Sequence, residues 1–176
     1  MLLFALWFPL LLASVANQAT APANYWTDVP TASARRRLGA PRLRPTRYRV
    51  LKLDETAARR FLQRVPAQGD APALLALPLP NGRMVAFRVQ RTAVMHPALA
   101  ARYPELQTFA GKDAQDPSAD LRLELTPTGL RAQIIGYGST FLVEPYRPDD
   151  TAHYLSFDKA ALPSGSKQWA EPAPTP

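Results

Sequence analysis

Residues 121–146, LRLELTPTGLRAQIIGYGSTFLVEPY, contain two consecutive strand pairs together with their turns. Apolar and polar side chains alternate over 121–125 and again over 130–134, which is the period of a half-buried strand. Between these runs, Thr-Pro-Thr-Gly at 126–129 has proline and glycine where a turn favours them. Gly-Tyr-Gly-Ser at 136–139 forms a second break before a third apolar run. The stretch therefore predicts a three-stranded antiparallel meander.

The alternation also predicts the register of the first strand pair. If the turn has two central residues, Glu124 faces Arg131 and Arg122 faces Gln133, while the apolar side chains share the other face. A slip by one residue would place a leucine against an arginine, so this register is favoured. A bulge at Gly129 is the alternative, because an ordinary type I turn twists a two-residue hairpin in the unfavourable sense.

Upstream of the meander, the pattern predicts a strand, a helix and a hairpin. Residues 48–53 alternate as a strand, and Asp54 follows as the N-cap of a helix whose apolar residues keep helical spacing until Pro66. Apolar strands at 74–80 and 84–92 flank an Asn-Gly pair, which is the strongest short signal for a hairpin.

A short helix at 98–102, a strand at 106–109, a loop at 111–117 and a last strand at 153–158 complete the predicted elements. We expect a mainly β (α+β) fold, an antiparallel sheet or sandwich with one amphipathic helix near the start and a short second helix. With 176 residues, of which 47% are hydrophobic, the chain is long enough for one domain with a core plus tails. We assign this β-rich module to residues 47–162.

Residues 1–21 are predicted to be a secretory signal peptide. Residues 2–12 form an apolar run, broken by Pro9, that is too short for a membrane span of about twenty residues. Small residues follow, with candidate cleavage patterns at 14–16 and 19–21. The chain has no cysteine, which excludes disulfides, thiolate metal ligands and a lipid anchor on cysteine. We expect a secreted or periplasmic protein that is not an integral membrane protein after signal cleavage.

The net charge of +7 is concentrated in one segment. Seven arginines and no acidic residue occur from Arg35 to Arg49, while the rest of the chain has 14 basic and 14 acidic residues. Glycine and prolines in the same segment predict an extended Arg/Pro-rich linker over 22–46 rather than a helix. Such an arm is typical of a tether or of a contact for an acidic surface, and we expect no nucleic-acid partner. A Pro-rich linker or tail is expected at 163–176. The basic arm consists of Arg35, Arg36, Arg37, Arg42 and Arg44.

The sequence contains no motif for catalysis, metal binding or a cofactor. The two histidines, His96 and His153, lie far apart and lack the spacing of metal ligands. There is no Gly-x-Ser-x-Gly, no phosphate-binding glycine loop and no cysteine nucleophile. Asp113 and Asp116, in the loop between two strands, are the best-placed carboxylates, and ordinary turn chemistry is the alternative role for them. We therefore predict that this chain is not an enzyme and has no catalytic residue, metal site or cofactor.

Eight short motifs follow one another along the chain: LPLPNG at 77–82, FRV at 87–89, VMHPALA at 94–100, YPELQTFAG at 103–111, DP at 116–117, LRLELTPTGLRA at 121–132, EPY at 144–146 and HYLSF at 153–157. In this order they resemble the N-terminal pro-region of bacterial secreted reprolysin-like zinc metallopeptidases. The resemblance covers residues 47–162. It implies a β-rich prodomain that precedes the protease domain, assists its folding and covers its active-site cleft until it is removed.

The chain departs from this family in three ways. It lacks the protease domain with its His-Glu-x-x-His helix, it lacks the cysteine that blocks zinc in animal relatives, and Gln115 precedes Asp116 where the family has a second acid. The resemblance implies a truncated precursor or a stand-alone inhibitor, with a metallopeptidase domain as its partner in cis or in trans. Asp113 and Asp116 would then lie in a loop that contacts the cleft. The alternative is an exported binding module that contacts anionic envelope material through its basic arm.

Overall fold

The computed structural model of the chain describes residues 21–163, so nearly all of the predicted signal peptide and of the Pro-rich tail lie outside the described residues. Three α-helices and one short 3-10 helix are found in this range: α1 (Thr31–Leu38), α2 (Glu55–Gln63), α3 (Pro97–Arg102) and η1 (Lys159–Ala161). The strands are β1 (Trp26–Val29), β2 (Arg49–Leu53), β3 (Ala73–Pro78), β4 (Met84–Thr92), β5 (Gln107–Asp113), β6 (Asp120–Thr126), β7 (Gly129–Gly136), β8 (Ser139–Pro145) and β9 (His153–Asp158).

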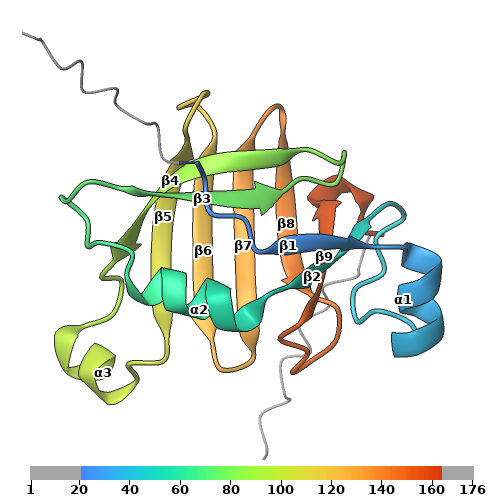
Figure 1. Ribbon diagram of the computed structural model, residues 1–176, viewed down its shortest axis with the longest axis horizontal. Helices are drawn as coiled ribbons and strands as arrows, with labels where there is room; N and C mark the ends of the chain where they lie inside the picture. Colours follow the sequence, from blue (N-terminus) through green and yellow to red (C-terminus); the bar gives the residue numbers. More distant parts are fainter. Residues whose placement is uncertain (1–20, 164–176) are drawn as a thin grey trace, which may run out of the picture.

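All nine described strands belong to one sheet, in the order β1-β2-β9-β8-β7-β6-β5-β4-β3. Every neighbouring pair is antiparallel. The predicted mainly β fold is confirmed, as a single curled sheet (Figure 1). Within residues 21–163, no helix has the length and apolar character that a membrane span requires.

The predicted meander is formed by β6, β7 and β8, and the predicted register of its first pair is confirmed. Glu124 faces Arg131 and Arg122 faces Gln133, with two central residues in the turn between the strands. Gly129, where a bulge was the alternative, is paired in the ladder and has a φ of +123°. Glycine adopts this φ without the steric strain that a Cβ would cause.

The predicted hairpin and the predicted capped helix are also confirmed. β3 and β4 pair on either side of the Asn-Gly turn, and Asp54 Oδ1 accepts a hydrogen bond of 3.0 Å from Ala57 N at the start of α2. β5 is longer than predicted and includes the first part of the expected 111–117 loop. Gly111 makes this possible, because a Cβ there would lie 2.7 Å from the Arg88 carbonyl oxygen of the neighbouring β4.

The N-terminal segment links the two edges of the sheet. Ala23 forms a parallel bridge to Leu75 of β3, with a hydrogen bond of 3.0 Å from Ala23 N to Leu74 O and one of 2.8 Å from Ala76 N to Ala23 O. The same segment then becomes β1, which pairs with β2 at the opposite edge. Because of this curl, β3 and β4 run across the front of β5–β8 (Figure 1).

The main core fills the inside of the curl. Leu121, Leu123 and Leu125 of β6 point into it, as their alternation predicted, and are buried. α2 contributes Ala58 and Leu62 to the same cluster and lies in front of the lower part of β5–β7 (Figure 1). Removing these apolar side chains from water is the main favourable contribution to folding.

Residues 22–46 do not form the extended linker that their composition predicted; that prediction is wrong. They form β1, α1 and a loop that packs on the outer face of β8 and β9. Trp26 of β1 is 8% exposed, and Ala34 of α1 is fully buried in a second cluster. Arg42 N donates a hydrogen bond of 2.9 Å to Tyr146 O, which fastens the loop to the end of β8. The few buried side chains of this segment therefore determine its structure, although arginine and proline dominate its composition.

Candidate functional site

Exposed apolar side chains gather around α3. Among the described residues, five large hydrophobic side chains are strongly exposed, and four of them belong to the segment 94–106. The fifth, Ile135 of β7, is 48% exposed. A concentration of apolar side chains on a surface is typical of a contact site. We call the four residues the α3 patch: Val94, Leu99, Tyr103 and Leu106, which are 69%, 47%, 37% and 37% exposed.

The local sequence explains why these side chains remain at the surface. Pro97 occupies the start of α3, and His96 Nδ1 accepts a hydrogen bond of 3.4 Å from Ala98 N. The helix ends at Arg102, two residues before Pro104, and none of its residues is buried. A helix of six residues is too short to pack a complete apolar stripe on the sheet, so its apolar side chains face solvent.

Two adjoining hollows lie next to the α3 patch. One, of about 500 Å³, lies beside α3 and β4 and has mainly apolar lining residues such as Met95 and Leu106. The other, of about 360 Å³, lies on the outer face of β6, β7 and β8. Thr92, Val94 and Thr108 line both hollows, so the two adjoin, and we call them together the groove. Its α3 end is mainly apolar, and its other end has a mixed lining that includes several charged residues.

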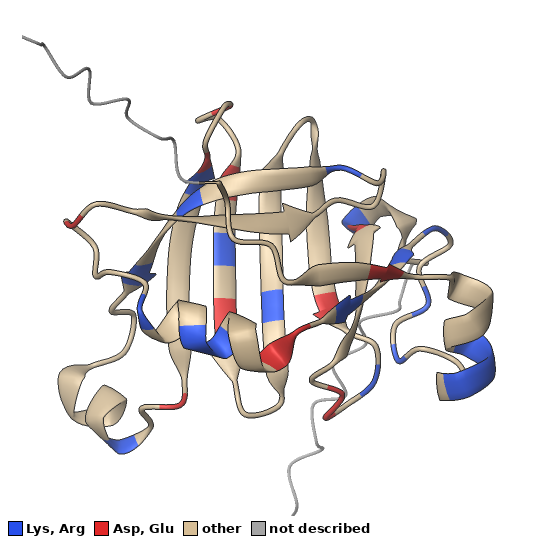
Figure 2. Cartoon of the chain, in the orientation of Figure 1, with Lys and Arg blue, Asp and Glu red and all other residues tan. Residues whose placement is uncertain are grey.

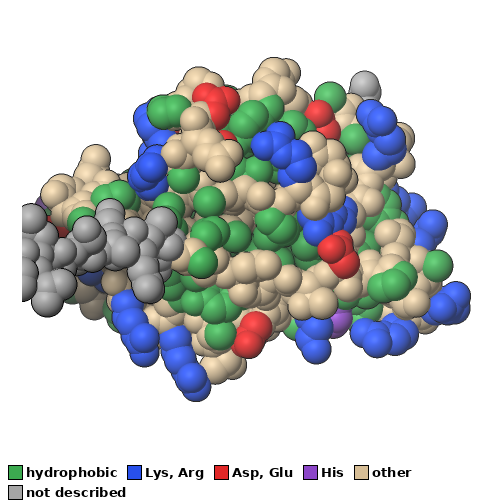
Figure 3. All heavy atoms as spheres, turned by 45° about the horizontal axis from the view of Figure 1, so that its top comes forward, with side chains coloured by type: hydrophobic (Ala, Val, Ile, Leu, Met, Phe, Trp, Pro, Cys, Tyr) green, Lys and Arg blue, Asp and Glu red, His purple; other side chains and the backbone are tan. Residues whose placement is uncertain are grey.

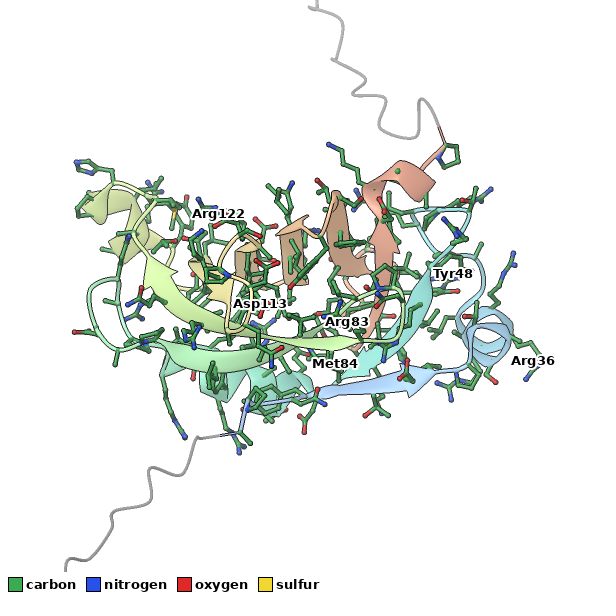
Figure 4. The ribbon with its side chains drawn as sticks, turned by 90° about the horizontal axis from the view of Figure 1, so that it is seen from above. Arg36, Tyr48, Arg83, Met84, Asp113 and Arg122 are labelled. Atoms are coloured by element: carbon green, nitrogen blue, oxygen red, sulfur yellow. The ribbon has the colours of Figure 1, made fainter. Side chains whose placement is uncertain are left out.

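Charged side chains form a row across this other end of the groove. Arg131 Nη1 lies 3.4 Å from Glu124 Oε1, and Arg131 Nε lies 3.2 Å from Glu144 Oε2, so one guanidinium bridges carboxylates on both neighbouring strands. Arg122 faces Gln133 across β6 and β7 and is exposed on the outer side of the sheet (Figure 4). This end of the groove therefore presents both hydrogen-bond donors and acceptors to a partner.

The structure places Asp113 inside the molecule. It is the last residue of β5 and is 4% exposed. Tyr137 Oη donates a hydrogen bond to Asp113 Oδ2, and Gln115 N donates one of 2.8 Å to Asp113 Oδ1. The pKa of the Tyr137 phenol is raised, mainly because the group is partly buried and secondly because it is hydrogen-bonded to the Asp113 carboxylate. The Arg83 guanidinium carbon lies 5.6 Å from the centre of the Tyr137 ring, so these residues connect β5 to the turns of two hairpins (Figure 4).

Asp116 is half-buried in the loop before β6 and stabilises a turn. Its Oδ1 accepts hydrogen bonds of 2.6 Å from Ser118 Oγ and of 3.1 Å from Ser118 N. The Ser118 hydroxyl lowers the pKa of the Asp116 carboxyl below its usual value. Of the two acids that the sequence singled out, only Asp116 is therefore accessible to a partner.

The arginines of the basic arm lie at the opposite end of the molecule from α3 (Figure 2). All of them are exposed, and none makes a salt bridge with another residue in the range 21–163. The fold adds Arg147, which the sequence reading missed: its Nη2 would lie 2.5 Å from a Cβ at Gly39, next to the arm. The predicted members are Arg35, Arg36 and Arg37 on α1, and Arg42 and Arg44 on the loop that follows.

The two histidines have local structural contacts. His96 caps α3, and His153 Nδ1 lies 3.2 Å from Asp150 Oδ2 at the start of β9. In the part of the chain that the structure describes, no three His, Asp or Glu residues are grouped in a way that could hold a metal ion. The described features that could contact a partner are therefore the α3 patch with its groove and the arginines of the opposite end.

The α3 patch is a feature that the sequence reading did not single out as a contact site. Of its four residues, only Leu99 lies in the predicted helix 98–102, Leu106 lies in the predicted strand 106–109, and all four occupy motif positions. The available signal was the closeness of Pro97 and Pro104, which leaves room for fewer than two helical turns. Comparisons with known proteins add no relative: no family model, curated protein or solved structure matches this chain.

Proposed function

We propose that this chain is a non-catalytic, prodomain-like module of a secreted zinc metallopeptidase, which assists folding of the protease domain and covers its active-site cleft. It acts as part of a precursor or as an inhibitor in trans, and it is exported to the periplasm or the medium. The proposal rests on the ordered motifs that resemble such pro-regions. The observation that carries it furthest is that the exposed α3 patch is built from two of these motifs, 94–100 and 103–111.

The α3 patch and its groove have the composition of a protein contact surface. The relative exposures of the four patch residues together amount to about two fully exposed residues. Covering them would stabilise a complex by about 3–6 kcal/mol before the entropic cost of association. The bridged Glu124, Arg131 and Glu144 at the other end of the groove provide a polar rim, as is usual around the apolar centre of an interface.

The direct test is to add the full chain in trans to a secreted reprolysin-like zinc metallopeptidase domain and to measure peptide hydrolysis. We expect slower hydrolysis and a higher yield of active protease on refolding. The double variant Val94→Ser/Leu99→Ser should weaken inhibition about ten-fold or more, because it removes the two most exposed apolar side chains of the patch.

Ile135→Ser is the matched control, because Ile135 is as exposed as Leu99 but belongs to β7 outside the patch. It should inhibit like the unmodified chain. Unchanged hydrolysis at saturating concentrations of the unmodified chain would overturn the inhibitor form of the proposal. An equal loss of inhibition in the patch variant and in the control would overturn the role of the α3 patch.

A second candidate function is an exported module that contacts anionic envelope material through its basic arm. The observation that favours it is the set of exposed arginines at the α1 end, which make no salt bridge within residues 21–163. Since the α1 end lies away from α3, the two surfaces can be tested separately (Figure 1).

A further inference from the structure

The α1 end of the molecule presents exposed arginines that come from parts of the chain far apart in sequence (Figure 2). We propose that this set binds a flexible anionic polysaccharide, through its repeated sulfate, phosphate or carboxylate groups. This inference rests on the second candidate function above, for which it names the ligand class, and the binding is independent of the α3 patch. Figure 3 shows basic side chains around the right-hand end, where α1 lies in Figure 1. We call the set the arginine surface: Arg35, Arg36, Arg37, Arg42, Arg44, Arg47 and Arg147.

The fold holds these arginines in place before any ligand binds. Ala34 anchors α1 on the second core cluster, and Pro41 and Pro45 are buried in the loop that follows. Backbone hydrogen bonds fasten this loop to the rest of the domain at two points. One of them, of 2.8 Å, is donated by Thr46 N to Ala161 O. Tyr146 Oη donates a further hydrogen bond of 2.7 Å to Gly39 O, just after the end of α1. Because the backbone is already ordered, binding would require ordering only of the arginine side chains.

The positive charges of the arginine surface are not neutralised by salt bridges within the described part of the chain. None of its seven members makes a salt bridge within the described part of the chain, and the hydrogen bond recorded for Arg36 is one of 3.3 Å to Ser33 Oγ. Arg49, two residues after the last arginine of the loop, behaves differently: its Nε and Nη2 donate to both carboxylate oxygens of Asp28. Unpaired like charges raise the local positive potential, which attracts a polyanion and is screened by salt.

The shape of the surface favours a flexible ligand over a rigid one. Successive residues of an α-helix point about 100° apart, so Arg35, Arg36 and Arg37 fan out around α1 instead of lining one face. A straight duplex or a flat bilayer could reach only part of this fan, whereas a flexible chain can wrap around it.

The other side chains around α1 distinguish an anionic polysaccharide from a single-stranded nucleic acid and from a membrane surface. Tyr48 is half-buried against the second cluster, and no aromatic side chain between residues 31 and 48 is exposed for stacking on unpaired bases. Leu38 and Leu43 also pack on that cluster, so they are not free to insert into a bilayer. An anionic polysaccharide needs neither contact.

The test measures binding of the full chain to heparin, a sulfated polysaccharide, at low ionic strength. Point substitutions are required, because deleting 35–49 would remove the second half of α1 and Arg49 of β2 together with the charges. Arg36→Gln/Arg37→Gln should weaken heparin binding about 2- to 30-fold, as expected for the loss of two surface ion pairs. Arg60→Gln/Arg64→Gln is the matched control, since it lowers the net charge equally from exposed positions on and just after α2.

The expected result is a loss of heparin affinity in the α1 variant and an affinity within about two-fold of the unmodified chain in the control. Circular dichroism checks that both variants keep the fold. Equal losses in the two variants, or no heparin binding at all, would overturn the proposal. So would tighter binding to duplex DNA, to oligo-dT or to vesicles of anionic phospholipid than to heparin. Val94→Ser/Leu99→Ser should bind heparin normally, so a failure of the protease proposal leaves this one intact.

Discussion

Replacement of Trp26 by alanine tests whether the segment before β2 belongs to the folded domain. Trp26 lies on β1 at the edge of the sheet and is 8% exposed. Its ring meets the Tyr154 ring edge-on, with the ring centres 5.2 Å apart and an interplanar angle of 88°. It also belongs to the main core cluster inside the curl. If the segment were a tether, none of these contacts would contribute to stability.

The contacts of Trp26 determine how much of the free energy of unfolding should be lost in Trp26→Ala. Truncation of a buried tryptophan to alanine costs about 3–5 kcal/mol, and the edge-on aromatic pair with Tyr154 accounts for about 0.5–1.5 kcal/mol of such a loss. The whole free energy of unfolding of a domain of this size is about 5–15 kcal/mol. Trp26→Ala should therefore remove a large fraction of the stability, and Trp26→Phe should remove less because an aromatic ring remains.

The assay is a urea titration of the full chain followed by far-UV circular dichroism, because fluorescence would change with the tryptophan itself. Thr27→Ala is the control, since Thr27 is the exposed neighbour on the same strand, and it should change the free energy of unfolding by no more than about 0.5 kcal/mol. A loss of less than about 1 kcal/mol in Trp26→Ala would refute the reasoning, because it would mean that β1 does not stabilise the fold.

Two further substitutions test individual hydrogen bonds. Tyr154→Phe removes the Oη that accepts a hydrogen bond of 3.1 Å from the buried Leu130 N, so a urea titration should show a loss of about 1–3 kcal/mol, while Tyr103→Phe at the surface should show none. The hydrogen bond from Arg49 lowers the pKa of the Asp28 carboxyl below its usual value, so the stabilisation is present above the unfolded pKa and is lost as the pH falls through the lower folded pKa. The difference in melting temperature between the unmodified chain and Asp28→Asn should therefore disappear in strong acid, and a difference independent of pH would contradict this account.

The elements that the sequence predicted correctly are those whose determinants are local. In the β6–β7 pair, each leucine on the inner face has a charged or polar neighbour on the outer face, and glycine follows the turn. A shift of one residue would expose the leucines and bury Arg131, so the sequence allows one register. The hairpin between β3 and β4 was predictable for the same reason, because its turn residues lie between two apolar runs.

Residues 22–46 could not be predicted in this way, because their structure depends on partners that are distant in sequence: β1 pairs with β2, and the loop after α1 is bonded to residues more than a hundred positions away. Ala34 packs with Leu142 and Phe157, and the loop is bonded to Tyr146 and Ala161. The composition of the segment is dominated by exposed arginines and by prolines, and it does not reveal which few side chains are buried.

The position of Asp113 was missed for a different reason. The predicted strand ended at Phe109, which left Asp113 in a loop. The structure continues β5 for four more residues, and the period of two then places Asp113 on the same inner face as Phe109. A carboxylate at this position must be hydrogen-bonded, and Tyr137 Oη and Gln115 N supply those bonds. These contacts give Asp113 a structural role in the described fold.

The curl of the sheet explains why the α3 patch and the arginine surface, the two proposed contact surfaces, lie at opposite ends of one small domain. The inner face is filled by the main core, so only the outer face remains to be covered or exposed. Over β8 and β9 it is covered by α1 and the loop that follows, and because this cover buries only small or apolar residues, its arginines point outward. Over β6 and β7 the outer face is not covered by any element within residues 21–163: Arg122 and Glu124 are exposed, and the groove begins there. A protein partner on the α3 patch would therefore cover only the part of this open face where the groove lies, and Ile135, which does not line the groove, stays outside the contact. The face that α1 covers remains free to bind a polyanion.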